Sequence, residues 1–195
     1  MSGRATTMRT PGELIVQGYA SQDSLPALEQ VAARYAVAVT PAVAALIDKA
    51  ASDDPIARQY IPSADELVTQ PGEDADPIGD HPHSPVSGIV HRYPDRVLFK
   101  LVHVCAVYCR FCFRREMVGP GKDNGLSDEV YSKALDYIRS HPEVWEVILT
   151  GGDPLMLSAR RLREVMNDLA AIDHVKIIRI HTRVPVADPA RVTDD

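Results

Sequence analysis

All three cysteines of this 195-residue chain lie in one stretch, Cys105-Ala-Val-Tyr-Cys109-Arg-Phe-Cys112-Phe-Arg-Arg115. Thiols that served only for packing would be scattered along the sequence, so this clustering indicates a shared ligand. Three thiolates can hold three irons of a cubane iron–sulfur cluster, whereas a closed electron-transfer cluster usually has four cysteine ligands. The stretch therefore predicts an iron–sulfur cluster with one open iron.

An open iron of this kind can chelate the amino and carboxylate groups of S-adenosylmethionine, and an electron from the cluster then produces a carbon radical. Two other uses of the thiols stay open at this point. His103 could complete a zinc site, although structural zinc sites usually draw their ligands from two separate pairs rather than from one loop. A disulfide is less favoured, because three is an odd number of cysteines.

The composition is that of an ordinary globular protein and argues against nucleic acid as a partner. Hydrophobic residues make up 45% of the chain and charged residues 25%, and the formal net charge is −6. An acidic chain lacks the long-range attraction that a phosphate backbone requires. Residues 1–18 do not resemble an export signal, and no stretch approaches the roughly 18 apolar residues of a membrane span. We therefore expect a cytoplasmic protein without a membrane partner, where thiols stay reduced.

Strand-like and helix-like patterns alternate in the second half of the chain. The expected strands cover residues 96–102, 145–150 and 176–180, and the expected helices begin after Ser127 and Ser158. This alternation predicts an α/β fold with parallel strands. The cysteine stretch and Gly151-Gly152-Asp153 then both follow the carboxyl ends of strands, where parallel folds place their chemistry.

The first half of the chain has a different character. Short helices are expected between Ser24 and about Ile61, with start signals at Thr40-Pro41 and Asp54-Pro55. Residues 70–88 are rich in proline, glycine, aspartate and histidine and are expected to form a connector. We therefore predict two domains, a helical N-terminal region with its connector at 1–88 and an α/β domain at 89–195.

Four motifs in order carry a resemblance to a known family. The spacing Cys105-x3-Cys109-x2-Cys112, with Phe111 before the last cysteine, resembles the signature of radical S-adenosylmethionine enzymes. The other three segments are Tyr93-Pro-Asp-Arg-Val-Leu-Phe, Leu149-Thr-Gly-Gly-Asp-Pro-Leu and Arg179-Ile-His-Thr-Arg-Val-Pro-Val. Together, from about Val39 to the last residue, they resemble the lysine 2,3-aminomutase family, including its elongation factor P-modifying branch.

The resemblance implies a partial radical-SAM-type (β/α) barrel that follows a helical N-terminal region. It implies an isomerase that moves the amino group of lysine, or of a lysine-like substrate, from C2 to C3. Its cofactors would be a [4Fe-4S] cluster, S-adenosylmethionine and pyridoxal phosphate, and its partners an electron donor protein and further copies of the same chain. Two alternatives are a radical S-adenosylmethionine enzyme without pyridoxal phosphate and a noncatalytic metal-binding or iron–sulfur-binding fragment.

The resemblance also assigns roles to individual residues. The metal ligands would be Cys105, Cys109 and Cys112, and the loop that helps to hold the methionine amino group would be Gly151, Gly152 and Asp153. Arg92 and Arg96 would contact the phosphate of pyridoxal phosphate, and Tyr93 its ring. Arg114 would pair with the substrate carboxylate, which its planar guanidinium fits. A plain tight turn and surface arginines would give similar local patterns.

One departure from the family pattern concerns the end of the chain. The family barrel has about six β/α units, whereas at roughly 30 residues per unit residues 96–195 make about three. None of the lysines, Lys49, Lys100, Lys122, Lys133 and Lys176, stands in the motif of the family's lysine that binds pyridoxal phosphate. We therefore expect a chain truncated at its C-terminus that binds the cluster and cleaves S-adenosylmethionine without completing an aminomutase cycle.

Overall fold

The computed structural model describes residues 6–119 and 125–193, which form two compact units. The helical unit contains residues 6–75, 105–119 and 183–193, and the sheet unit contains residues 76–104 and 125–182. The cysteine stretch therefore belongs to the helical unit, and the Gly151-Gly152-Asp153 loop to the sheet unit. The predicted domain boundary after residue 88 stays a prediction.

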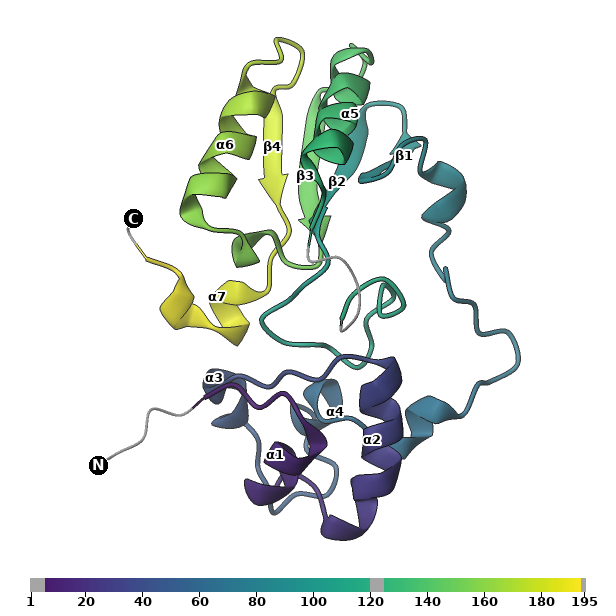
Figure 1. Cartoon of the computed structure of the whole chain (residues 1–195), viewed down its shortest axis with the longest axis vertical. Helices are drawn as coiled ribbons and strands as arrows, with labels where there is room; N and C mark the ends of the chain where they lie inside the picture. The colour runs from purple at the N-terminus through teal and green to yellow at the C-terminus, as the bar shows by residue number, and fades with distance from the viewer. Residues whose placement is uncertain (1–5, 120–124, 194–195) are drawn as a thin grey trace. The chain divides into compact units, whose positions relative to one another are not determined.

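The sheet unit is built on four strands in the order β1-β2-β3-β4 (Figure 1). Its elements are η3 (His81–His83), β1 (Ile89–Tyr93), β2 (Arg96–Val102), α5 (Asp128–Arg139), β3 (Glu146–Gly151), η4 (Pro154–Met156), α6 (Ala159–Ala170) and β4 (Ile177–Ile180). Strand β1 pairs antiparallel with β2, whereas the pairs β2–β3 and β3–β4 are parallel. The predicted α/β fold with parallel strands is confirmed.

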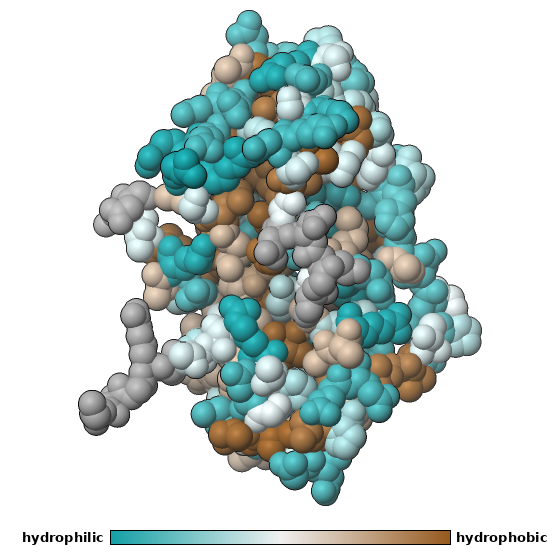
Figure 2. Space-filling view, viewed as in Figure 1, coloured by the Kyte–Doolittle hydropathy of each residue, from teal (hydrophilic) through white to brown (hydrophobic). Residues whose placement is uncertain are grey.

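Both long helices of the sheet unit begin at a capping serine, as the sequence predicts. The Ser127 hydroxyl accepts a hydrogen bond from Val130 N, and the Ser158 hydroxyl accepts one from Arg161 N. These bonds satisfy N–H groups that have no partner inside the first turn of a helix. The outward surface of α5 and α6 is largely hydrophilic (Figure 2). With 12 residues each, they are shorter than the roughly 20 residues of a spanning helix, and no described helix could cross a membrane.

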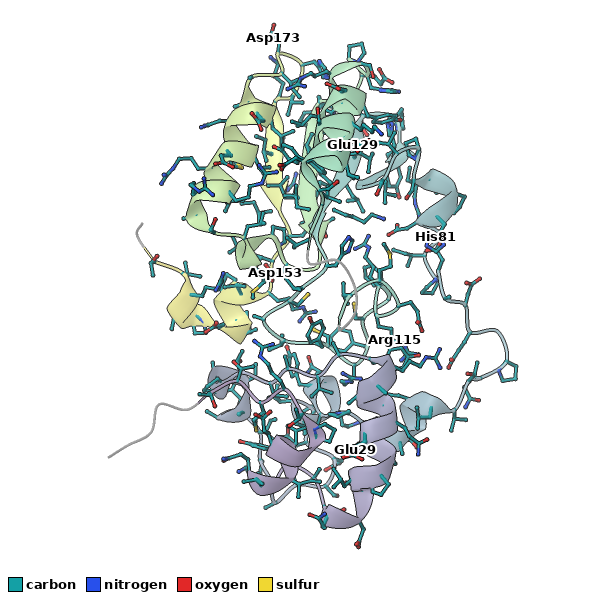
Figure 3. All side chains as sticks on the ribbon, viewed as in Figure 1. Glu29, His81, Arg115, Glu129, Asp153 and Asp173 are labelled. Atoms are coloured by element: carbon teal, nitrogen blue, oxygen red, sulfur yellow. The ribbon has the colours of Figure 1, made fainter. Side chains whose placement is uncertain are left out.

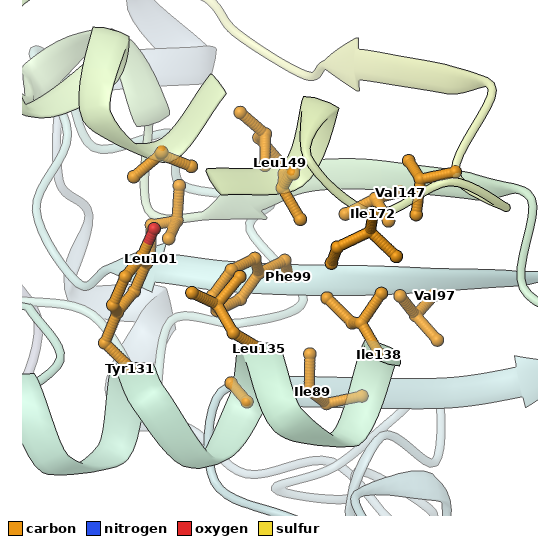
Figure 4. Packing of buried hydrophobic residues seen from close by; sticks show 14 of the residues in the cluster. Ile89, Val97, Phe99, Leu101, Tyr131, Leu135, Ile138, Val147, Leu149 and Ile172 are labelled. Atoms are coloured by element: carbon orange, nitrogen blue, oxygen red, sulfur yellow. The ribbon is translucent and has the colours of Figure 1, made fainter. Parts of the chain in front are cut away.

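One hydrophobic cluster joins both helices to a single face of the sheet (Figure 4). The sheet contributes alternate residues, and the helices contribute one stripe each. The buried members named in this contact are Val97, Phe99, Leu101, Val147, Leu149, Tyr131, Leu135, Ile138, Val165 and Leu169. Helices on one face are the arrangement of a β/α barrel, whereas a doubly wound sheet carries helices on both faces. The packing is thus that of a partial barrel.

Strand β1 is an element that the sequence analysis did not predict. It forms a hairpin with β2, in which Tyr93 pairs with Arg96 across the turn residues Pro94 and Asp95. A proline followed by aspartate is typical of such turns, so a local signal was present. Asp95 also accepts a hydrogen bond from the Trp145 indole at 3.2 Å, which fixes the turn against the start of β3.

The helical unit consists of short helices around a second hydrophobic cluster. Its elements are α1 (Pro11–Val16), η1 (Gln22–Ser24), α2 (Leu25–Arg34), α3 (Pro41–Ala44), α4 (Ala57–Tyr60), η2 (Ala64–Leu67), α7 (Val184–Ala187) and η5 (Pro189–Arg191). Its buried core contains Met8, Leu14, Val37, Val39, Val43, Tyr60, Val107 and Ala187. Val107 lies within the cysteine stretch, so the core of this unit extends into that stretch.

The caps explain where these short helices begin. The Thr40 hydroxyl accepts from Val43 N at the start of α3, as predicted, and Asp54 accepts from Ala57 N at 2.6 Å before α4. Helix α1 was not predicted, although Thr10 and Glu13 form a capping box in the spacing typical of that motif. The signal was therefore present in the sequence.

Phe99 is fully buried at the centre of the sheet cluster, so its truncation should destabilise the sheet unit. We expect Phe99→Ala to lower the free energy of unfolding by about 3–5 kcal/mol, because the lost contacts leave a cavity. Urea unfolding followed by the fluorescence of Trp145, the one tryptophan of the chain, measures the change. The matched control is Tyr93→Ala on the neighbouring strand, where the side chain is 59% exposed and little change is expected. Equal losses in the two variants would contradict the packing described.

Candidate functional site

The cysteine stretch is a loop of consecutive turns within the helical unit. Cys112 N donates to the Cys109 carbonyl at 3.1 Å, and Arg115 N donates to the Cys112 carbonyl at 3.2 Å. Cys105, Cys109 and Cys112 form no disulfide in the described structure, and each is partly exposed. The predicted ligands therefore lie on one tightly wound segment with access to solvent.

The spacing of potential ligands bears on which metal the loop suits. Among the described residues, no three His, Cys, Asp or Glu side chains are gathered closely enough to hold one metal ion. A single zinc ion would bring its sulfur ligands to about 2.3 Å from one centre. In a cubane each thiolate binds a different iron, so the thiols stand farther apart. One loop supplies all three thiols, which is unusual for a structural zinc site.

Cys109 has an environment that acts on its ionisation in two directions. Burial against the helical core raises the pKa of the Cys109 thiol, and the neighbouring Cys112 raises it as well. The positive charges of Arg183 and Arg110 lower the same pKa. Because only the thiolate binds metal, the two arginines favour the ligand form that burial opposes.

Exposed aromatic rings with arginines above them border the loop. Phe111 and Phe113 are 55% and 49% exposed. The Arg183 guanidinium lies 5.3 Å from the centre of the Phe111 ring, and that of Arg114 lies 4.7 Å from the Phe113 ring. Arg183 also hydrogen-bonds with the Tyr60 side chain. Arg114 was a predicted site residue, whereas Arg183 was not, because its partners Phe111 and Tyr60 are distant in the sequence.

The Gly151-Gly152-Asp153 loop at the end of β3 requires its glycines because two backbone segments meet there. Gly152 N donates to the Val102 carbonyl at 2.5 Å, and Asp153 N donates to the Val104 carbonyl at 2.9 Å. A Cβ atom on Gly152 would lie 2.7 Å from Val104 N, closer than real Cβ contacts come. Gly151 has a φ of +116°, which side chains disfavour. The loop is thus held against the residues that lead directly into Cys105.

Asp153 is buried, and its carboxylate is committed to contacts within the sheet unit. It accepts from Leu155 N at 3.0 Å, which caps η4, and from the Thr182 hydroxyl at 2.6 Å. Figure 3 shows Asp153 at the carboxyl end of β3, whereas Asp173 lies at the opposite end of the sheet. Thr182 follows β4, so Asp153 joins the polar loops of two adjacent strands. Thr182 was not among the predicted site residues.

The sheet unit separates the two predicted cofactor sets rather than bringing them together. Arg96 is in register with Glu146 at the amino ends of β2 and β3, and Val102 is in register with Gly151 at their carboxyl ends. Six residues of strand at about 3.3 Å each place Arg96 about 20 Å from the glycine loop. Arg92 and Tyr93 lie on β1, near the same hairpin as Arg96.

The hairpin arginines already bind carbonyl and carboxylate groups. Arg92 donates to the Ile78 carbonyl and, at 3.0 Å, to the Gly79 carbonyl, and it lies 3.7 Å from the buried Asp80 carboxylate. These contacts fold the connector back onto β1.

Arg96 also binds carboxylates, chiefly that of the adjacent Asp95. Its guanidinium donates to both oxygens of Asp95 at 3.0 and 2.9 Å and lies 3.6 Å from Glu146. Hydrogen bonds from Arg96 and Trp145 hold the pKa of Asp95 well below its usual range, so this carboxylate stays charged. The Arg96 donors that face Asp95 could bind a phosphate only by releasing that carboxylate.

The close approach at Gly152 predicts a specific mutational effect. We expect Gly152→Ala to lower the free energy of unfolding of the sheet unit by about 1–3 kcal/mol, because the methyl group has no room beside Val104. Trp145 fluorescence during urea unfolding measures it. The matched control is Gly12→Ala, where a methyl group meets nothing within 4 Å and helix propensity favours alanine. A Gly152→Ala protein as stable as wild type would contradict the close approach.

Comparison with known proteins agrees with these features. The model of the Radical SAM superfamily matches residues 99–193. An L-lysine 2,3-aminomutase of Methanococcus maripaludis is 43% identical over 162 residues, which cover 83% of this chain and 37% of that protein. The L-lysine 2,3-aminomutases of Clostridium subterminale and Escherichia coli are each 42% identical, over 82% and 76% of this chain and 38% and 42% of their own lengths. The chain spans about two fifths of the length of these curated relatives. It belongs to the radical SAM superfamily and, within it, to the lysine 2,3-aminomutase family.

Proposed function

We propose that Cys105, Cys109 and Cys112 hold a [4Fe-4S] cluster whose open iron binds S-adenosylmethionine, and that the protein moves the amino group of lysine. The observation that carries the cluster proposal is that one wound loop supplies all three cysteines, each of them partly exposed. The donor set fits the group, since thiolates are the ligands that iron–sulfur clusters require. The relatives are named as L-lysine 2,3-aminomutases, which supports lysine as the substrate class.

Some residues of this chain would bind the cluster, and others would bind S-adenosylmethionine or the substrate. When bound, the cluster supplies the electron that breaks a carbon–sulfur bond of S-adenosylmethionine. The three thiolates hold their irons and leave the fourth accessible. The backbone of Gly151 and Gly152 carries no side chain that would block a ligand, and the Arg114 fork suits a substrate carboxylate. An electron donor protein would reduce the cluster.

Pyridoxal phosphate, which the family implies, fits the described residues less well. The hairpin arginines Arg92 and Arg96 are engaged by carboxylates, as shown above. Among the described lysines, Lys49 donates to the Gln17 carbonyl at 2.7 Å, Lys133 pairs with Glu129, Lys176 donates to the Asp173 carbonyl, and Lys100 is buried within β2. Lys122 lies outside the described residues. We therefore assign the chain no step that passes through this cofactor.

The cluster proposal predicts loss of iron when a ligand is removed. We expect wild-type protein, reconstituted without oxygen, to bind about four irons and to form 5′-deoxyadenosine from S-adenosylmethionine after reduction. Cys105→Ala, Cys109→Ala and Cys112→Ala should each abolish the cluster signal in electron paramagnetic resonance spectra. The control is Arg163→Ala on α6, which should keep the signal. Stoichiometric zinc without iron in anaerobically purified protein would refute the proposal.

The engaged lysines predict that this 195-residue chain does not form a stable adduct with pyridoxal phosphate. After incubation with the cofactor and reduction with borohydride, we expect no lysine to be modified in stoichiometric amount, because a Schiff base needs an accessible amine beside the bound phosphate. Peptide mass spectrometry identifies any modified lysine, and an assay for β-lysine runs in parallel. One fully modified lysine together with β-lysine formation would show that the chain binds the cofactor productively.

A further inference from the structure

Arg110, between the second and third cysteines, ties the cysteine loop to three other segments of the helical unit. Its Nε donates to Glu66 Oε1 at 2.9 Å, its Nη2 donates to Glu66 Oε2 at 2.6 Å, and its Nη1 donates to the Ala36 carbonyl at 2.7 Å. Its backbone N–H donates to the Gln59 carbonyl at 2.8 Å. We propose that Arg110 and Glu66 are a positioning pair, which holds the loop in the form that accepts the cluster.

The pair is shielded from water, unlike most ion pairs of the described chain. The side chains of Arg110 and Glu66 are only 8% and 11% exposed. Two buried charges are costly to desolvate, and the cost is recovered only where geometry is good and the remaining donors are satisfied. The bidentate contact and the bond to Ala36 meet that condition. Replacing either Arg110 or Glu66 with a neutral residue would leave the charge of the other buried without its partner.

Glu66 is itself held in place before it meets Arg110. It is the third residue of η2, and its Oε1 accepts from Ser63 N at 3.1 Å in a capping box. The carboxylate therefore has a fixed direction that does not depend on the loop. A fixed acceptor gives Arg110 one preferred position, and the loop backbone moves with that side chain.

The geometry requires the shape of arginine and not only its charge. The planar guanidinium directs donors to Glu66 and to Ala36 at the same time, whereas the single ammonium group of lysine has no such fork. We therefore expect a lysine at position 110 to keep the positive charge but not the simultaneous hydrogen bonds to Glu66 and Ala36.

Cys109 is the thiol that this arrangement controls most directly. The residue before it, Tyr108, donates its backbone N–H to the Ala38 carbonyl at 3.3 Å, and the residue after it is Arg110. The chain on both sides of Cys109 is thus tied to the N-terminal part of the helical unit. Loss of the Arg110 side-chain contacts would release the segment that follows Cys109. The partly buried Cys109 thiol should then be exposed to solvent more often.

The first test uses the full chain without metal. We compare wild type, Arg110→Lys and Glu66→Gln for the rate at which iodoacetamide alkylates Cys109, measured by peptide mass spectrometry, with circular dichroism to confirm folding. We expect about tenfold faster alkylation in both variants, as the loss of one hydrogen bond to a charged group implies. The matched control is Glu146→Gln, which breaks a buried carboxylate–arginine contact in the sheet unit and should leave the rate unchanged.

The second test asks whether the cluster responds, and it rests on the proposed function. After reconstitution, we expect both variants to bind less iron and to give a broader electron paramagnetic resonance signal than wild type and Glu146→Gln. Alkylation rates equal to wild type in both variants would overturn the positioning pair, whatever the iron content. If wild type binds no iron, the proposed cluster fails, and the metal-free alkylation still decides the role of the pair. If Glu66→Gln does not fold, Arg110→Lys, which keeps the charge, decides it.

Discussion

The backbone contact between the end of β3 and the residues that follow β2 is the constraint on which the candidate site depends. Gly152 and Asp153 donate to the carbonyls of Val102 and Val104, and Cys105 is the next residue of the chain. Parallel strands end at a common edge, so pairing of β2 with β3 fixes where the cysteine stretch departs. A side chain at Gly152 would push these segments apart. The glycine pair is therefore required by strand geometry, whatever ligand the loop also approaches.

Elements that depend on short-range signals were predicted well from the sequence. The apolar run of β2 and the capping serines before α5 and α6 identify these elements, because strand burial and helix capping involve neighbouring residues. Helix α1 and strand β1 were missed although their signals, a capping box and a Pro-Asp turn, are equally local. Residues close in sequence therefore contain enough information to predict both elements.

The candidate site was only partly predictable, for a different physical reason. The cluster ligands are close in sequence, so their clustering is visible without a structure. The partners of the arginines are not: Arg110 meets Glu66, 44 residues away, and Arg92 meets Asp80 across the connector. Such pairs form only when the chain folds. From the sequence alone, an arginine that binds phosphate cannot be distinguished from an arginine that pairs with a distant carboxylate. Asp153 is similar, since its cap and its bond to Thr182 become visible only in three dimensions.

The positions of the partners of Arg110 in the sequence have a consequence for the synthesis of the protein on the ribosome. Ala36, Gln59 and Glu66 all precede Arg110 in the chain, so each of its partners is synthesised before it. Domains generally fold as units, and the N-terminal domain folds first during synthesis. The partners of Arg110 are therefore already present when the three cysteines are synthesised, whereas residues 183–193, which complete the helical unit, follow β4. Moving residues 6–75 to the C-terminus by circular permutation would reverse that order, so that the three cysteines would be synthesised before the partners of Arg110.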